Sequence, residues 1–225
     1  VERNGPGKFD IKNVVAADEW AENVDNNAFT NAAAKANLQY ATEAAKLLGL
    51  TADPDWMNVA NNIPILKMAD GVTQEHASYK GEGIKQADVN LLAYPLTEIT
   101  DLKQIQKDLS YYETRVPDQG TPAMTQAVFA TLYARLGDGE KAYHFFKDAY
   151  IPNLLPPFRV IAETKGGSNP YFATGAGAII QSLLFGFGGL SITPKGIVQI
   201  KSTLPKNWKS LTITGVSSEN RKFTR

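Results

Sequence analysis

The segment TPAMTQAVFATLYARLGDGEKAYHFFKDAY, residues 121–150, most restricts the folds that this chain can adopt. Pro122 stands near the start of a first helix, and Gly137-Asp138-Gly139 supplies a turn before a second one. Apolar residues recur on one side of the second helix at helical spacing, which marks its buried side. The segment therefore predicts a helical hairpin.

Two more helices are predicted before this hairpin. The first runs roughly from Asn26 to Leu48, with Asp25 as its N-terminal cap and Gly49 as its C-terminal stop. The second begins at Asp53-Pro54, because Asp is a common cap and Pro is favoured in the first turn. Residues 63–83 are expected to form loops or short strands.

Three apolar or charged runs predict the remaining helices. GIKQADVNLLAYPL, which begins at Gly83, is typical of a mostly apolar helix that ends at Pro95. A further helix is expected over residues 101–110. The run GAGAIIQSLLFGF, residues 175–187, has small or apolar residues nearly all round, which is typical of a helix buried on every side.

Strand signals lie at the two ends of the chain. Residues 1–17 are expected to be extended, with a turn at 5–7, and GGLSIT, GIVQI and KSLTITGV form short β-branched runs between turns at 194–196 and 205–207. Paired helices thus precede a small β region, with no alternation of strand and helix. This order favours a mainly α protein, an α/α toroid or bundle with an appended sheet, over a doubly wound fold.

Composition narrows the chemistry. Lys plus Arg and Asp plus Glu both total 23, so we expect no nucleic acid and no membrane as partner. The chain has no Cys, which excludes thiolate nucleophiles and zinc–thiolate sites. Its two histidines, His76 and His144, are far apart in the sequence, so we expect no metal and no cofactor.

Carboxylates remain as the groups that could perform catalysis, since no G-x-S-x-G or G-x-x-x-x-G-K-[ST] motif is present. Glycoside hydrolysis is the reaction class that two carboxylates can run alone. Glu19 is the first candidate, because a carboxyl beside Trp20 in an enclosed site would have a raised pKa and could donate a proton. The alternative is that Asp18, Glu19 and Glu22 are first-turn acids that interact with a helix dipole.

Two loops hold the other carboxylate candidates. Glu163 lies in VIAETKGGSNPYF, before a Gly-Gly turn, where a loop can hold a functional residue over a cavity. Its alternative role is that of an ordinary exposed loop acid. Glu113 follows two tyrosines in YYETR and could instead be a structural acid kept ionised by Arg115.

Lys85 and Gln86 form the remaining polar candidate. Both open the predicted helix after Gly83, so they are expected at its mouth. Together they offer five N–H donors and one carbonyl, which suits sugar hydroxyls. A solvated first turn is the alternative.

Several of these segments together resemble glycoside hydrolase family 65. DEWAENVDNNAFTN is similar to the family signature D-E-Y-H-E-N-V-D-N-N-A-Y-T-N, and IKQADV matches a second signature without change. YYETR, ARLGDGEKAYHFF, and FGFGGLSIT followed by LPKNW resemble further blocks in the same order. The family contains maltose, kojibiose and trehalose phosphorylases, acid trehalases and kojibiose-type α-glucosidases.

The resemblance implies an (α/α)6 barrel followed by a small β domain. Residues 1–188 would be the C-terminal half of the barrel, and residues 189–225 would be the C-terminal β region. The remaining N-terminal half of the same enzyme would then be a partner in the site, and this chain alone would be inactive. A homodimer is left open, and a periplasmic or secreted bacterial location is compatible with the sequence.

The resemblance also assigns roles to the candidates. Glu19 would be the general acid, and Lys85 and Gln86 would hold the non-reducing glucose. Trp20 stands where the family has Tyr, in Trp20-Ala21 instead of Tyr-His, which implies a reshaped site for the leaving sugar. Glu113 lies in a family block and is taken as a further substrate-binding residue.

The attacking group, water in a hydrolase or phosphate in a phosphorylase, remains to be predicted. The phosphorylases bind phosphate with an H-G-S-S-type loop after Y-Y-E-x-R and with a short G-I-H-A-x-x-M-G-G segment. Here VPDQGTPAMT has no His and no Ser-Ser, and the second loop is longer and carries Glu163. A carboxylate at that place repels a phosphate dianion and supplies a base for water.

The sequence therefore predicts an inverting hydrolase that acts on a small α-glucoside, a disaccharide of the kojibiose or trehalose type, and releases β-glucose. Its two carboxyls, Glu19 as acid and Glu163 as base, should stand about 6.5–9.5 Å apart, which leaves room for the attacking water. A family 65 disaccharide phosphorylase is one alternative. A non-catalytic carbohydrate-binding scaffold is the other.

Overall fold

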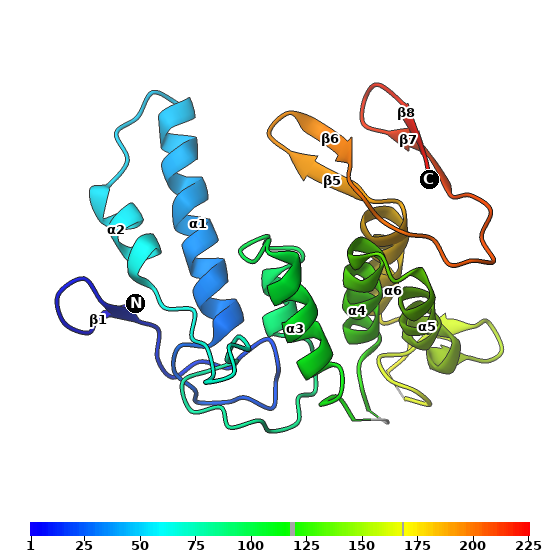
Figure 1. Ribbon diagram of the computed structural model, residues 1–225, viewed down its shortest axis with the longest axis horizontal. Coiled ribbons are helices and arrows are strands. Elements are labelled where there is room, and N and C mark those ends of the chain that lie inside the picture. The colour runs from blue at the N-terminus through cyan, green and yellow to red at the C-terminus, as the bar shows by residue number, and fades with distance from the viewer. Residues whose placement is uncertain (118–119, 168) are drawn as a thin grey trace. The chain divides into compact units, whose positions relative to one another are not determined.

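A computed structural model gives the structure of the chain and describes residues 1–117, 120–167 and 169–225. These residues form two compact units, Val1–Arg115 and Val116–Arg225 (Figure 1). Helices α1 to α3 belong to the first unit, and α4 to α6 belong to the second. The strands that the structure describes form two-stranded sheets, so helices are the main elements, as the sequence predicts.

The first unit opens with a short antiparallel hairpin of β1, Glu2–Arg3, and β2, Phe9–Asp10. Its turn contains two glycines with positive φ, 91° at Gly5 and 64° at Gly7. Glycine adopts this backbone without a steric penalty. The expected turn at residues 5–7 is confirmed.

Helix α1 spans Ala28–Leu47, so it begins two residues later than predicted. Its cap is Asn27, whose side-chain oxygen accepts a hydrogen bond from the Thr30 N–H at 2.9 Å. The expected cap, Asp25, is wrong, because its carboxylate instead accepts the N–H of Asn13 at 2.9 Å. The stop at Gly49 is confirmed, with φ 69°.

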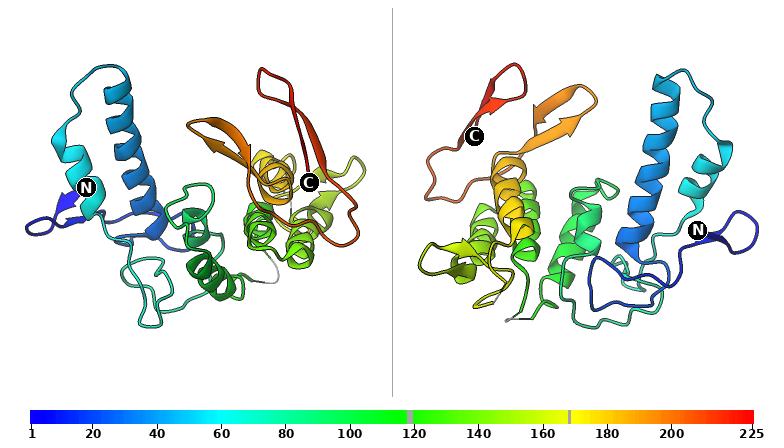
Figure 2. Two further views of the ribbon diagram at one scale, coloured as in Figure 1. Left: turned by 45° about the horizontal axis from the view of Figure 1, so that its top comes forward. Right: turned by 180° about the vertical axis from the view of Figure 1, so that it is seen from behind.

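Helix α2 spans Pro54–Asn62, and the carboxylate of Asp53 caps it by accepting the Asp55 N–H at 2.9 Å. Both the Asp cap and the Pro in the first turn are as predicted. The two views in Figure 2 show α2 lying beside α1. Residues 63–83 form loops with one isolated bridge, as expected.

The predicted helix over residues 83–95 is wrong. Only a short 3-10 helix, η1 at Val89–Leu92, forms there. The N–H groups of Lys85 and Gln86 donate to the carboxylate of Asp18, at 2.9 and 3.3 Å. A distant side chain thus binds the donors that would have started the helix, and tertiary contacts override the local preference.

Helix α3 spans Leu102–Tyr112 and is capped by Asp101, so the helix predicted from Asp101 is confirmed and runs slightly further. Its last residue, Tyr112, is buried and donates its hydroxyl to the Thr73 carbonyl at 2.7 Å. This bond fixes the end of α3 against the loop that follows α2.

The second unit contains the predicted hairpin. Helix α4 spans Ala123–Leu136, and α5 spans Gly139–Tyr150. Gly137 ends α4 with φ 99°, and the carboxylate of Asp138 caps α5 by accepting the Lys141 N–H at 2.9 Å. The Gly-Asp-Gly turn thus supplies both the stop and the start.

A loop region joins α5 to the last helix. It contains a short 3-10 helix, η2 at Ile151–Asn153, and a hairpin of β3, Leu154–Leu155, with β4, Val160–Ile161. Helix α6, Ala173–Gln181, follows and continues as a π-helix, η3, at Ser182–Phe187.

The prediction that this helix is buried on every side is wrong. Ile180 is 56% exposed, whereas Gly175 is buried against α4. The second half is more enclosed, since Ser182, Gly186 and Phe187 are buried. Small residues let one side of the helix approach α4 closely, and its other side has no cover within the described part of this unit.

The chain closes with two hairpins. The first pairs β5, Leu190–Thr193, with β6, Gly196–Gln199, around the predicted turn at 194–196. The second pairs β7, Thr212–Val216, with β8, Arg221–Thr224, and β8 was not predicted. The division between a barrel part at 1–188 and a β region at 189–225 stays a prediction.

Candidate active site

Two buried carboxylates connect the segments that carry the candidate residues. Asp88 accepts the N–H groups of Ala17 and Asp18, at 3.0 and 3.4 Å. It also accepts the Asn27 amide at 3.0 Å and the Phe29 N–H at 3.3 Å. One carboxylate therefore holds the start of α1 and the loop that precedes it.

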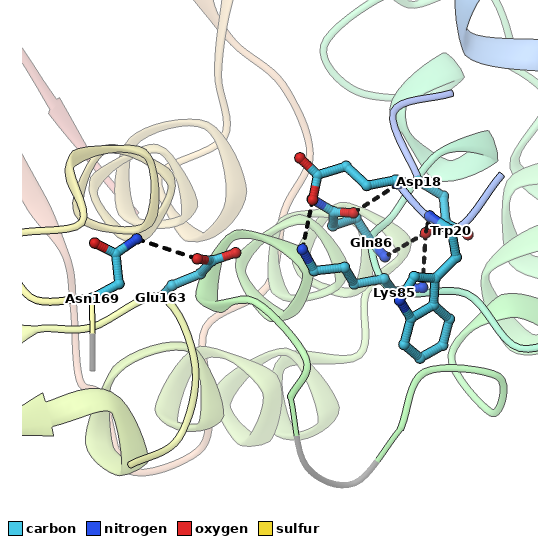
Figure 3. Close-up of polar contacts among 7 residues, drawn as sticks. Asp18, Trp20, Lys85, Gln86, Glu163 and Asn169 are labelled. Carbon is cyan, nitrogen blue, oxygen red and sulfur yellow. Dashed lines mark hydrogen bonds and ion pairs between the residues drawn. The ribbon is translucent and has the colours of Figure 1, made fainter. Parts of the chain in front are cut away.

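Asp18 reciprocates across the same two segments. Its carboxylate accepts the N–H groups of Lys85 and Gln86, and that of Trp20 at 3.3 Å. Figure 3 shows Asp18, Trp20, Lys85 and Gln86 gathered at this place. We name the reciprocal pair of Asp18 and Asp88 the carboxylate clasp, and it fixes residues 17–20 against residues 85–88.

The clasp brings three predicted site residues together. The ammonium of Lys85 lies 2.5 Å from a carboxylate oxygen of Glu19, and the Glu19 N–H donates to the side-chain carbonyl of Gln86 at 2.9 Å. Gln86 is buried, at 6% exposure. An acid, a cation and a carboxamide thus meet at one point, although Lys85 and Gln86 lie in a loop and not on a helix.

The pKa of Glu19 differs from the expectation. Its side chain is 57% exposed, and Trp20 is 59% exposed, so the indole does not enclose the carboxyl. Hydrogen bonds from Lys85 and Gln86 lower the pKa of Glu19. The predicted rise is wrong for the structure as it stands, because the contact with Lys85 outweighs burial.

The alternative reading of the acids as first-turn residues is also wrong. Helix α1 begins at Ala28 and carries no acid in its first turn. Asp18 is buried at 2% exposure and acts through the clasp. Neither Asp18 nor Asp88 was predicted as a site residue. Their positions inside the two matching blocks, DEWAENVDNNAFTN and IKQADV, were the signal that could have identified them.

A cavity of about 240 Å³ lies behind the loop of Trp20. Polar and titratable side chains contribute most of its lining, among them Asp18, Glu22, Glu75, His76, Tyr79 and Glu82. Burial raises the pKa of Asp88, beneath the same loop, to about 6 in spite of its four N–H donors. Acidic side chains are therefore concentrated under the loop that carries Glu19.

Glu163 lies in the second unit, on the segment after β4. Its backbone carbonyl accepts the N–H of Ala123, the first residue of α4, at 2.8 Å. Its carboxylate accepts the side-chain amide of Asn169 at 3.3 Å, as drawn in Figure 3. The side chain is half-buried. Because Glu19 belongs to the first unit, the distance between the two carboxyls stays a prediction.

Glu113 caps the C-terminal end of α3 and is half-buried. Nearby, the guanidinium of Arg115 donates to the Tyr111 carbonyl and lies 3.3 Å from the centre of the Tyr111 ring. The Arg115 carbonyl accepts the N–H of Ile84, next to Lys85. This contact ties the end of the first unit to the loop of Lys85, and a substrate-binding role for Glu113 stays a prediction.

The described residues offer neither a metal site nor a membrane-spanning helix. Across residues 1–117, 120–167 and 169–225, no group of three or more His, Asp or Glu side chains could hold a metal ion. In the same part of the chain, no helix combines the length and the apolar character needed to cross a bilayer. Of the two loops compared with phosphate sites, residues 118–119 and Ser168 lie outside the described residues.

Comparison with known proteins identifies the family. The profile of the glycosyl hydrolase family 65 central catalytic domain matches residues 1–82 and 64–154. The chain belongs to glycosyl hydrolase family 65. The resemblance noted in the sequence is thereby confirmed.

Particular relatives make the match more specific. The chain is 75% identical over 223 residues to the kojibiose hydrolase of Mucilaginibacter mallensis, and 61% identical over 224 residues to that of Flavobacterium johnsoniae. Each alignment covers 99% of this chain and 33% of the relative. The chain thus spans about a third of the length of these curated relatives.

A solved structure shares the fold. It is a proposed kojibiose phosphorylase from the human microbiome, with a TM-score of 0.73 and 18% identity. The match covers 97% of this chain and 35% of that one. At this identity the likeness concerns the fold alone.

Proposed function

We propose that this chain carries the acid and the base of an inverting α-glucoside hydrolase that acts on a kojibiose-type disaccharide and releases β-glucose. The observation that supports it best is the meeting of Glu19, Lys85 and Gln86 in a chain that aligns with two kojibiose hydrolases over 99% of its length. The α helices of residues 1–188 would form part of an (α/α)6 barrel, followed by a β region at 189–225.

Glu19 is the proposed general acid, which protonates the glycosidic oxygen as the bond to the leaving sugar breaks. Lys85 and Gln86 hold the glucose, because an ammonium and a carboxamide can donate to and accept from its hydroxyls. Trp20, which is 59% exposed beside Glu19, offers an apolar face for the leaving sugar. Glu113 is kept as a further substrate contact.

A general acid has to hold a proton, whereas Lys85 lowers the pKa of Glu19 in the open site. Substrate binding resolves this conflict in the proposed mechanism. A bound glucose that takes hydrogen bonds from Lys85 weakens the ion pair, and the same sugar, enclosed by the rest of the enzyme, displaces water from Glu19. Both changes disfavour the carboxylate and favour the protonated acid.

Glu163 is the proposed base for the attacking water. The hydrogen bond from the Ala123 N–H to the Glu163 carbonyl fixes this residue to the start of α4, and Asn169 orients its carboxylate. A carboxylate at this place favours water over phosphate, since phosphate at neutral pH would be repelled. The phosphorylase alternative therefore requires other groups to hold phosphate.

The test measures products on the full-length enzyme with kojibiose, trehalose and maltose, each with and without phosphate. We expect β-glucose, seen by proton NMR before mutarotation, with no dependence on phosphate. Glu19→Gln and Glu163→Gln should each lower kcat by about 10²–10⁴-fold, the usual contribution of a general acid or base. β-Glucose 1-phosphate as product would establish the phosphorylase instead.

Two exposed carboxylates provide matched controls for these variants. Glu22 lies three residues after Glu19, and Glu219 lies in the turn between β7 and β8. Glu22→Gln and Glu219→Gln make the same chemical change and should leave kcat unchanged. Full activity in Glu19→Gln would contradict any catalytic reading and favour a carbohydrate-binding scaffold.

A further inference from the structure

Glu75 is a buried carboxyl that the proposed mechanism does not use. Its side chain is 1% exposed and lines the 240 Å³ cavity, and its Oε1 has no hydrogen-bond partner among the described residues. Its backbone carbonyl accepts the N–H of Ala28 at 2.7 Å and the amide of Asn27 at 3.1 Å. The start of α1 therefore holds Glu75 in place, and an enclosed carboxyl must be neutral or well compensated.

The neighbours of Glu75 determine where its proton resides. The side chains of Glu75 and Asp18 line the same cavity, and a hydrogen bond between them is among the causes that raise the pKa of Glu75. Such a bond between two carboxyls requires one proton. Asp18 accepts three backbone N–H groups, and Asp88 accepts four N–H donors in total. The two aspartates take these N–H donors, whereas Oε1 of Glu75 accepts none, so the proton of the pair belongs to Glu75.

The electrostatics of the cavity agree with this assignment. Burial, together with the charges of Asp88 and Asp18, raises the pKa of Glu75 to about 9. Burial lowers the pKa of His76, so it adds little positive charge at neutral pH. The other titratable groups that face Glu75 are Glu82, Tyr79 and Tyr112.

We propose that Glu75 is a positioning residue that stays protonated and donates a hydrogen bond to Asp18, whose carboxylate holds the backbone of Lys85 and Gln86 against Glu19. The effect on catalysis rests on the proposed function. The proton on Glu75 does not, and it has its own measurement.

The catalytic consequence is tested with two substitutions in the full-length enzyme. Glu75→Gln keeps the shape and a hydrogen-bond donor, so kcat for kojibiose should stay within about threefold of wild type. Glu75→Met has a similar length and no donor, so kcat should fall about tenfold or more, the equivalent of one lost hydrogen bond. Glu22→Gln, in the same cavity, is the control and should match wild type.

Rescue by the conservative variant is the deciding result. An active Glu75→Met enzyme would overturn the proposal, because the donor would then be unnecessary. A Glu75→Gln enzyme as weak as Glu75→Met would also overturn it, because a charge or an acid would then be required. If wild type releases no glucose, the proposed function fails, and the proton on Glu75 is still decided by stability.

Stability against pH measures the proton directly. An unfolded Glu titrates near about pH 4.3, so between there and about 9 the folded chain keeps a proton that the unfolded chain releases. The contribution of Glu75 to stability therefore falls as the pH rises through this window. Gln does not titrate, so the Tm of Glu75→Gln should rise relative to wild type between about pH 5 and about pH 9.

The control again separates a local effect from general charge removal. Glu22→Gln should follow the wild-type Tm curve at a constant offset. A Glu75→Gln curve that also runs parallel to wild type would show that Glu75 is ionised in the folded protein, and the proposal would fall.

Discussion

The ion pair between Glu19 and Lys85 means that one residue, Lys85, can change the pKa of Glu19. The exposed carboxyl has a lowered pKa because the ammonium and the Gln86 amide stabilise its charge. The pH dependence of kcat/KM reports the free enzyme, so activity should fall as the pH rises through the lowered pKa of Glu19. This predicts an acidic optimum for kcat/KM.

Replacing Lys85 tests this prediction. Lys85→Met removes the positive charge, so the pKa of Glu19 should rise and the alkaline side of the kcat/KM profile should move to higher pH. The maximum itself should fall, because the glucose loses a contact. Lys80→Met removes an exposed lysine from the same unit and should leave the profile in place. An unmoved profile in Lys85→Met would mean that another group controls it.

The sequence predicted some residues of the site and missed others for a physical reason. Recognisable motifs contain Glu19, Lys85 and Gln86, and the structure brings these three residues together. Asp18 lies in a matching block but has no local feature that indicates its role, and Glu75 lies outside these blocks. The importance of both comes from burial against residues far along the chain. For the same reason the sign of the Glu19 pKa shift was wrong, since the lysine contact could not be read from residues 18–20.

At the scale of elements, predictions from local sequence succeeded where the contacts that form the element join residues close together in the sequence. The Asp53 cap, the helix start at Asp101 and the turn at Asp138 were predicted correctly, because in each case the Asp side chain accepts an N–H group only a few residues away. The predicted helix over residues 83–95 was wrong because Asp18, from a distant segment, accepts the N–H groups of Lys85 and Gln86. The predicted burial of α6 was wrong because apolar composition does not show which neighbouring element covers each side of a helix.

The hairpin of α4 and α5 depends on a glycine at its turn. A Cβ at Gly139 would lie 2.6 Å from the Leu204 carbonyl carbon and 3.1 Å from the Pro205 nitrogen, which are backbone atoms that cannot turn away. Gly139→Ala should therefore lower the free energy of unfolding by about 1–3 kcal/mol, as in other overpacked sites. Thermal unfolding measures the change.

Gly177 in α6 is the matched control for this substitution. A Cβ there meets nothing within 4 Å, and the residue has helical neighbours on both sides. Gly177→Ala should stabilise the protein by about 0.5–1 kcal/mol, because alanine loses less backbone entropy in a helix. The two stability changes need not be equal in size. A Gly139→Ala substitution that stabilises the protein would contradict the packing described for the turn.

At the scale of the whole molecule, the chain spans 33% of its kojibiose hydrolase relatives. We expect the 225-residue chain on its own to release no measurable glucose from kojibiose, and the full-length enzyme to release it. The reason is that Glu19 is 57% exposed here, and water favours its carboxylate over the protonated acid. A glucose assay on both proteins decides the question, and equal kcat values would mean that this chain completes the site by itself.

The clasp has one more consequence, for the engineering of specificity. Asp18 and Asp88 bind main-chain amides, which every residue except proline possesses, and the hydrogen bond at position 20 uses the backbone N–H and not the indole. A library randomised at Trp20 should therefore change which leaving groups are accepted, while Glu19, the proposed general acid, keeps its position.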